Sequence, residues 1–125
     1  MPKRTMLTIF VMFAAMLACG DDGNDLPCDE RRTHAYEMID SALNENLSCK
    51  VDKDCTTVNI DTDCSSTCLV AVSKDGLQVV KDVVIQVNDD YCQGYQKDDC
   101  TVLAGDCGPQ VPTCTNNGEC VMAIP

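Results

Sequence analysis

Cysteine is the residue type with the most possible chemistry in this chain, because eleven of its 125 residues are cysteines. Thiols can bind metals, exchange disulfides or form permanent crosslinks, and their spacing distinguishes these uses. The spacing Cys-x-x-Cys, on which zinc ribbons and thioredoxin-like sites depend, does not occur in the sequence. We therefore expect structural disulfides. Ten cysteines form an even set for five such bonds: Cys28, Cys49, Cys55, Cys64, Cys68, Cys92, Cys100, Cys107, Cys114 and Cys120.

The sequence does not fix how these ten cysteines pair. Two pairs are suggested by proximity along the chain. Cys64 and Cys68 are separated by only three residues and are the simplest partners. Cys114 would lie opposite Cys120 in a predicted hairpin, close enough to bond across the two strands. The remaining connectivity stays open.

Aspartates form a second group of candidate ligands. Residues 52–57 and 61–66 each begin with Asp-x-Asp, as a calcium loop does when alternating oxygens wrap the ion. Thr57 and Ser66 occupy the position at which such a loop needs Gly, and no Glu stands where the bidentate ligand belongs. We interpret these aspartates as acceptors for nearby backbone N–H groups in the turns around the cysteines, with calcium binding as an alternative.

No group of residues with the types and spacing of a catalytic site is evident in the sequence. His34 is the only histidine, and we predict that it is exposed on the polar side of a helix, too far from Ser41 to activate it. The aspartate pairs at 89–90 and 98–99 are chain neighbours that face different ways, whereas a general acid and base need a shared cleft. We predict no catalytic residue, no metal ligand, no cofactor and no enzyme activity.

The N-terminal residues have the pattern of an export signal. Lys3 and Arg4 precede an uncharged apolar run that is too short to span a bilayer and ends in a small-residue context at Cys19. A cut after Gly20 would instead give a plainly secreted protein. Both cuts exclude the cytoplasm. The chain then divides into a signal peptide at residues 1–18, an acidic tether at residues 19–27 and a disulfide-stapled domain at residues 28–125.

Acidic residues dominate the mature chain. Without Lys3 and Arg4, seven basic residues stand against twenty acidic ones, which gives a net charge of −13. Such a surface repels phosphate backbones and anionic lipid heads, so it argues against nucleic-acid binding and suits a cationic partner. Only Tyr36, Tyr91 and Tyr95 supply aromatic rings after the signal. The core is therefore thin, and we expect disulfides to supply much of the stability.

Hydrophobic periodicity predicts a small α+β domain, in which two helices pack on a short antiparallel sheet with a C-terminal hairpin. Asp75 has the position of an N-cap for the second helix, with Gln78 reaching back in a capping box. Asn117-Gly118 marks the hairpin turn. We predict helices at residues 29–47 and 75–91, short strands at residues 56–60, 69–72 and 101–103, and hairpin strands at residues 111–115 and 119–124.

The apolar run ending at Cys19 resembles the lipobox of bacterial lipoproteins, in which that cysteine carries a thioether-linked diacylglycerol. The resemblance implies lipidation of Cys19, with palmitate among the acyl chains. Gly20 rather than Asp follows the cysteine, which implies the outer membrane. Together with two Cys-x5-Cys segments and Cys64-x3-Cys68, the pattern is similar to small cysteine-rich lipoproteins of myxobacterial type, whose function is unknown.

We therefore expect a lipid-anchored, non-enzymatic binding or structural module of the cell envelope, whose partners are the membrane and an unknown protein or small ligand. One alternative is a secreted inhibitor or ligand of a cationic enzyme, which would present a rigid loop at residues 61–67 or 100–113. The Cys49-x5-Cys55 segment with an Asp inside resembles four-disulfide-core protease inhibitors only distantly, because the chain lacks their adjacent cysteine pair and has two predicted helices that they do not have. Calcium binding outside the cell is the other alternative.

Overall fold

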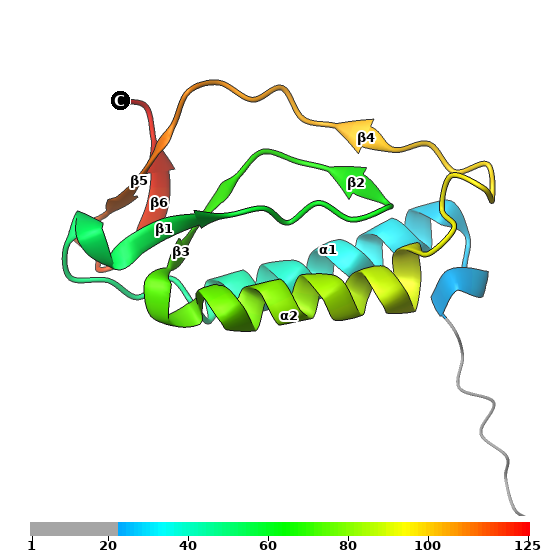
Figure 1. Cartoon of the computed structure of the whole chain (residues 1–125), viewed down its shortest axis with the longest axis horizontal. Helices are drawn as coiled ribbons and strands as arrows, with labels where there is room; N and C mark the ends of the chain where they lie inside the picture. Colours follow the sequence, from blue (N-terminus) through cyan, green and yellow to red (C-terminus); the bar gives the residue numbers. More distant parts are fainter. Residues whose placement is uncertain (1–22) are drawn as a thin grey trace, which may run out of the picture.

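The computed structural model describes residues 23–125, and they fold into two layers (Figure 1). Two helices, α1 (Cys28–Asn44) and α2 (Leu77–Val87), lie side by side in one layer, and short strands form the other. The predicted α+β class is confirmed. The predicted signal peptide and Cys19 lie outside the described residues.

Helix α1 begins directly after Pro27 and buries one face. Asp29 and Glu30 occupy its first turn, where carboxylates interact favourably with the helix dipole. The helix ends at Asn44, three residues earlier than predicted, because the Asn46 side chain donates a hydrogen bond of 2.7 Å to the carbonyl of Ala42. The chain then turns toward the strand layer.

Helix α2 follows a 3-10 turn at Lys74–Gly76 and continues into a π-helical turn at Asn88–Cys92. The predicted cap is wrong. Ser73, not Asp75, accepts the capping hydrogen bond, with its Oγ 3.1 Å from the Gly76 nitrogen. Gln78 instead donates to Asp82, one turn along the helix. The short turn before α2 shifts the capping role to the residue that ends the preceding strand.

The strands form three separate pairs where one sheet was expected. Strand β1 (Cys55–Val58) runs antiparallel to β3 (Val70–Ser73), and β5 (Val111–Cys114) runs antiparallel to β6 (Cys120–Ala123) in the predicted hairpin. The third pair is parallel and joins β2 (Ser65–Ser66) to β4 (Leu103–Ala104). The sequence predicted β4 in part but not its partner, since two serines carry no strand signal.

The core lies between the helices and the strands. α2 contributes valines spaced one and two turns apart, and α1 contributes an apolar stripe that faces them. The main buried side chains are Ala35, Ile39, Ala42, Leu43, Val58, Ile60, Val72, Val80, Val84, Val87 and Tyr95. A smaller cluster at the hairpin end is built around Cys49, Cys55, Ala71 and Cys120.

All ten predicted cysteines are disulfide-bonded, which confirms the expected crosslinks. The five bonds are Cys28–Cys100, Cys49–Cys114, Cys55–Cys120, Cys64–Cys92 and Cys68–Cys107.

Both pairs suggested by proximity along the chain are therefore wrong. Cys114 and Cys120 do face each other in the hairpin register, but each bonds to the segment that precedes β1 or begins it. Cys64 is fully buried and reaches Cys92 at the end of the helix layer. The extended residues of β2 carry Cys68 away from the helices, so that it meets Cys107.

The second half of the predicted tether belongs to the folded domain. Gly23–Asp25 forms a 3-10 turn, and the Asn24 amide donates to the Asp89 carbonyl at 3.0 Å. Gly23 is buried against the Tyr91 ring, where a larger side chain would collide with ring carbons. The chain thus enters the domain beside the π-helical turn.

Candidate functional site

Residues 101–110, which we call the pinned arch, contain the longest run of exposed residues in the part of the chain that the structure describes. The arch leaves the helix end of the molecule, passes along the outer side of β2 and leads into β5 (Figure 1). Every residue of the arch is exposed except Val102, which packs against the core. Leu103 in particular is 53% exposed. The arch therefore presents its side chains to solvent and adds little to the core.

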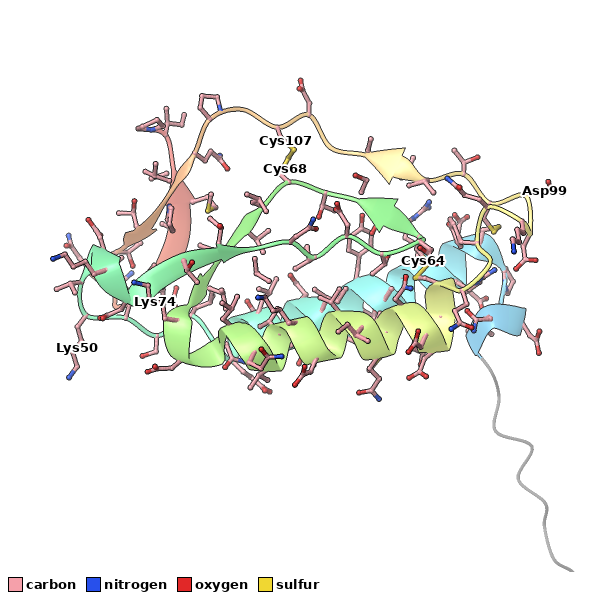
Figure 2. All side chains as sticks on the ribbon, in the orientation of Figure 1. Lys50, Cys64, Cys68, Lys74, Asp99 and Cys107 are labelled. Atoms are coloured by element: carbon pink, nitrogen blue, oxygen red, sulfur yellow. A yellow bond between two sulfur atoms is a disulfide. The ribbon has the colours of Figure 1, made fainter. Side chains whose placement is uncertain are left out.

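Three disulfides fix the arch in place. Cys100, directly before it, is bonded to Cys28 at the start of α1. Cys107 lies within it and is bonded to Cys68, as Figure 2 shows. Cys114, at the end of the following strand, is bonded to Cys49. The arch is thus exposed and covalently held at the same time.

The backbone of the arch is only partly hydrogen-bonded. The Gly105 N–H donates to the Ser66 carbonyl at 3.0 Å and extends the β2–β4 pairing. Beyond it, no N–H group of residues 106–110 donates to another residue of the described chain. These groups face solvent and are available to a partner.

A buried arginine organises the loop that leads into the arch. The Arg31 side chain is 1% exposed, and its guanidinium donates to the carbonyls of Tyr91 at 2.6 Å and Gln93 at 2.7 Å. It also contacts Asp98 at 2.9 Å and lies over the Tyr95 ring, 5.1 Å from its centroid. Nothing in the sequence pattern predicts this burial, because Arg31 stands in a run of charged residues, Asp29 to Arg32, at the start of the helix.

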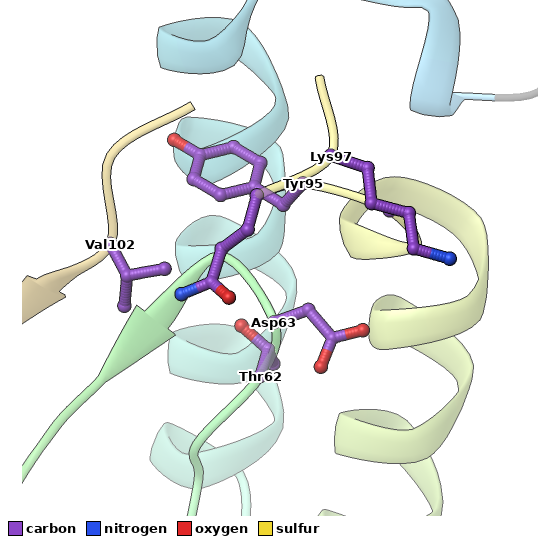
Figure 3. Close-up of a pocket in the computed structure, with 7 residues that line it drawn as sticks. Thr62, Asp63, Tyr95, Lys97 and Val102 are labelled. Atoms are coloured by element: carbon purple, nitrogen blue, oxygen red, sulfur yellow. The ribbon is translucent and has the colours of Figure 1, made fainter. Parts of the chain in front are cut away.

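A pocket of about 440 Å³ opens beneath the start of the arch (Figure 3). Tyr95 and Val102 supply its apolar surface, while Thr62, Asp63 and Lys97 supply polar groups. Asp63 and Lys97 make no ion pair with each other within the described residues. The pocket is of a size that small ligands occupy. Its polar side chains are mostly exposed, so it offers no buried recognition group.

Two of the four aspartates of the calcium-like segments, Asp54 and Asp61, accept backbone hydrogen bonds in their own turns, as interpreted. Asp54 accepts the N–H groups of Lys50 at 2.8 Å and Val51 at 3.1 Å, and these bonds hold its pKa below the ordinary value. Asp52 accepts a backbone hydrogen bond from a distant strand, the Cys114 N–H at 2.8 Å, and Asp63 contacts the Asn88 side chain. Each aspartate therefore has a structural role in which a carboxylate oxygen is already engaged.

Asp61 has the same role in the second candidate loop, residues 61–67. It accepts the Thr67 N–H at 2.6 Å, and a bridge between Thr62 and Ser65 closes the turn. Ser65 and Cys64 are buried. Of the two loops proposed for an inhibitor, the arch is therefore the more exposed.

Metal-ligating side chains gather at one place in residues 23–125, where the sulfurs of Cys49, Cys55 and Cys120 lie within 4.8 Å of one another. All three cysteines are in disulfides, and a disulfide sulfur is not the thiolate that binds a metal. The cluster marks two crosslinks packed side by side.

The predicted exposed histidine is confirmed. His34 is exposed and stacks on the Tyr91 ring at a centroid distance of 5.3 Å. The carboxylates of the two aspartate pairs are used separately, because Asp98 binds Arg31 while Asp89 accepts the Gln93 amide at 3.2 Å. They are not brought together as an acid and a base.

No protein-family model, curated protein or solved structure matches this chain. Within residues 23–125, no helix combines the length and the apolar character that a bilayer span requires.

Proposed function

We propose that this protein is an exported, lipid-anchored domain of the cell envelope that binds a partner protein through the pinned arch and catalyses no reaction. The observation that carries the proposal is the combination of exposure and covalent fixation in residues 101–110. Loops often carry binding residues, and a recognition segment gains affinity when it is held in its bound shape, because less conformational entropy is lost on binding.

Export is supported by the five disulfides, because such bonds persist in oxidising compartments and are rare in the cytoplasm. The apolar run before Cys19 supports it independently. With ten cysteines bonded, Cys19 is the one left over, and lipidation would account for it. The tether from Cys19 to Gly23 is only four residues, so the domain would stand within about 14 Å of the anchor.

Mass spectrometry of the mature N-terminus tests the anchor. We expect a chain that begins at Cys19 and carries a diacylglycerol and a further acyl group, and we expect the Cys19→Ala variant to lose both and to leave the membrane fraction. A chain that begins at Asp21, or an unmodified Cys19, would exclude the anchor and leave a secreted protein.

Photo-crosslinking in intact envelopes tests the arch. A photoreactive residue replaces Leu103 in one variant and Ile85 in another. Ile85 is a matched control because it is 62% exposed and lies on α2, across the molecule from β4 (Figure 1). We expect a discrete crosslinked product from position 103 and none from position 85. Equal products from both positions, or none from either, would contradict a binding role for the arch.

Inhibition of an extracellular endopeptidase is a second candidate function. It is favoured by one observation, the exposed segment fixed by disulfides on both sides, because preorganised segments of this kind can bind an enzyme as a substrate would. Assays of secreted endopeptidases with the purified mature protein test it. Absence of inhibition at micromolar concentration would count against this role.

A further inference from the structure

We infer that the open edge of β4, together with the arch residues that follow it, accepts an extended basic segment of a partner protein as an added β-strand. This inference rests on the proposed binding role of the arch and specifies both the surface and the chemistry of the partner.

Strand β4 has one paired edge and one open edge. It pairs with β2 alone among the strands of the described chain, and Figure 1 shows no element on its outer side. The Gly105 N–H points toward β2, since it donates to Ser66. Backbone groups alternate in direction along an extended chain, so the N–H groups of Ala104 and Asp106 point away from β2. They form the start of a free hydrogen-bonding edge.

The free edge continues beyond β4. By the same alternation the N–H groups of Asp106 and Gly108 point outward, and neither makes a hydrogen bond to the described chain. The Cys107 N–H would face the β2 side, and Pro109 has no N–H. A partner strand could therefore pair from Ala104 to Gly108, five residues or about 17 Å of extended chain. Strand addition at an exposed edge is a common mode of peptide recognition, in which backbone bonds give affinity and side chains give specificity.

The edge is held ready for this pairing. Cys68–Cys107 lies in the middle of the free edge, and Cys28–Cys100 precedes it. An edge fixed in this way loses little conformational entropy when a partner pairs with it.

Charge and apolar exposure define the partner. Residues 98–113 contain three aspartates and no lysine or arginine. Asp98 already pairs with Arg31, so Asp99 and Asp106 carry the charge that a partner could meet. Asp106 makes no ion pair in the described chain. Leu103, three positions before Asp106, is exposed and offers an apolar contact. An extended segment that alternates basic with β-branched residues would complement both features.

Binding of two synthetic peptides to the mature protein tests the inference. One ten-residue peptide alternates lysine and valine, and the other alternates glutamate and valine. We expect the lysine peptide to bind and to slow amide hydrogen exchange at Ala104 and Asp106, while the glutamate peptide does not bind. Equal binding of both peptides, binding of neither, or protection confined to other amides would overturn the inference.

A proline substitution separates backbone pairing from simple charge attraction. Ala104→Pro removes an N–H that faces outward and leaves the Gly105–Ser66 bond in place, and Ala104→Ser keeps the N–H as a control. We expect Ala104→Pro to weaken the lysine peptide about tenfold, the loss of roughly one well-made hydrogen bond. Unchanged affinity in Ala104→Pro would exclude strand addition.

A charge reversal provides a variant that keeps the backbone intact, in case Ala104→Pro does not fold. Asp106→Lys should weaken the lysine peptide, whereas Asp40→Lys, an equal change at an exposed site on α1, should not. Equal effects of the two reversals would mean that net charge alone attracts the peptide and would overturn the inference.

The crosslink from position 103 remains a separate readout of the binding role of the arch. If it forms while the peptide tests fail, the binding role stands and the added strand does not.

Discussion

Arg31 and Asp98 form an ion pair of 2.9 Å in which one side chain is 1% exposed and the other 55%. The pair is asymmetric, because Arg31 is desolvated and Asp98 is not. The cost of burying the Arg31 charge is offset by hydrogen bonds to two backbone carbonyls and by the Tyr95 ring. The loop that precedes the arch therefore supplies most of the partners of this charge. Loss of the arginine should therefore cost far more than loss of its acidic partner.

Arg31→Met should lower the free energy of unfolding by about 2–4 kcal/mol, because it leaves the part-buried carbonyls of Tyr91 and Gln93 without a donor. Asp98→Asn should cost only about 0–1 kcal/mol, since the side chain is half in water. Arg32→Met is a matched control, because Arg32 also pairs with an aspartate but near the surface. Denaturant unfolding with the disulfides intact measures all three. Equal losses for Arg31→Met and Arg32→Met would contradict the buried role of Arg31.

Asp54 should make stability depend on pH in the acid range. Its pKa lies below the ordinary 3.8, chiefly because the Lys50 and Val51 N–H groups bind the charged form. A carboxylate with a lowered pKa stabilises the fold above its unfolded-state pKa and loses that contribution as pH falls through the folded value. Melting temperatures of the native protein and of Asp54→Asn should therefore converge below about pH 3.8. A difference that stays constant down to pH 2 would show that the charge of Asp54 contributes nothing to stability.

Calcium should leave the melting temperature unchanged. A binding site would need the oxygens of Asp52, Asp54 and Asp61, each of which already accepts at least one backbone N–H. A ligand that binds only the folded state raises its melting temperature, by an amount that grows with the logarithm of the ligand concentration above Kd. Scanning calorimetry with calcium and with chelator makes the comparison. A rise in calcium that the chelator reverses would restore the calcium alternative.

The helices and the hairpin could be predicted because their signals are local. Val80, Val84 and Val87 recur at helical spacing, and Asn117-Gly118 favours a tight turn whatever surrounds it. The disulfide pairs could not be predicted in this way. They join residues 28 to 72 positions apart, and only the packed layers bring those residues together.

One signal for the pairing was present in the spacing of the cysteines. Cys49-x5-Cys55 and Cys114-x5-Cys120 have equal spacing, and the structure joins their first cysteines to each other and their second cysteines to each other.

The pinned arch was predicted only as one of two candidate loops. Its exposure depends on where Cys68 points, and that follows from the two-residue strand β2, which no local pattern predicts.

Cys68–Cys107 should be the first disulfide to open under mild reduction. Among the five bonds it is the only one in which neither cysteine is buried, whereas Cys64 and Cys92 are both fully buried. Reduction needs a thiolate in line with a disulfide sulfur, so access controls its rate. Graded reduction followed by alkylation and peptide mapping should label Cys68 and Cys107 first and Cys64 and Cys92 among the last. Because the other four bonds still hold the layers, near-native circular dichroism should persist after this first step, while proteases should begin to cleave residues 101–110. Opening of a buried pair first would contradict control of the order by access. An arch that stays resistant once Cys68 and Cys107 are labelled would show that its backbone holds its shape without the crosslink.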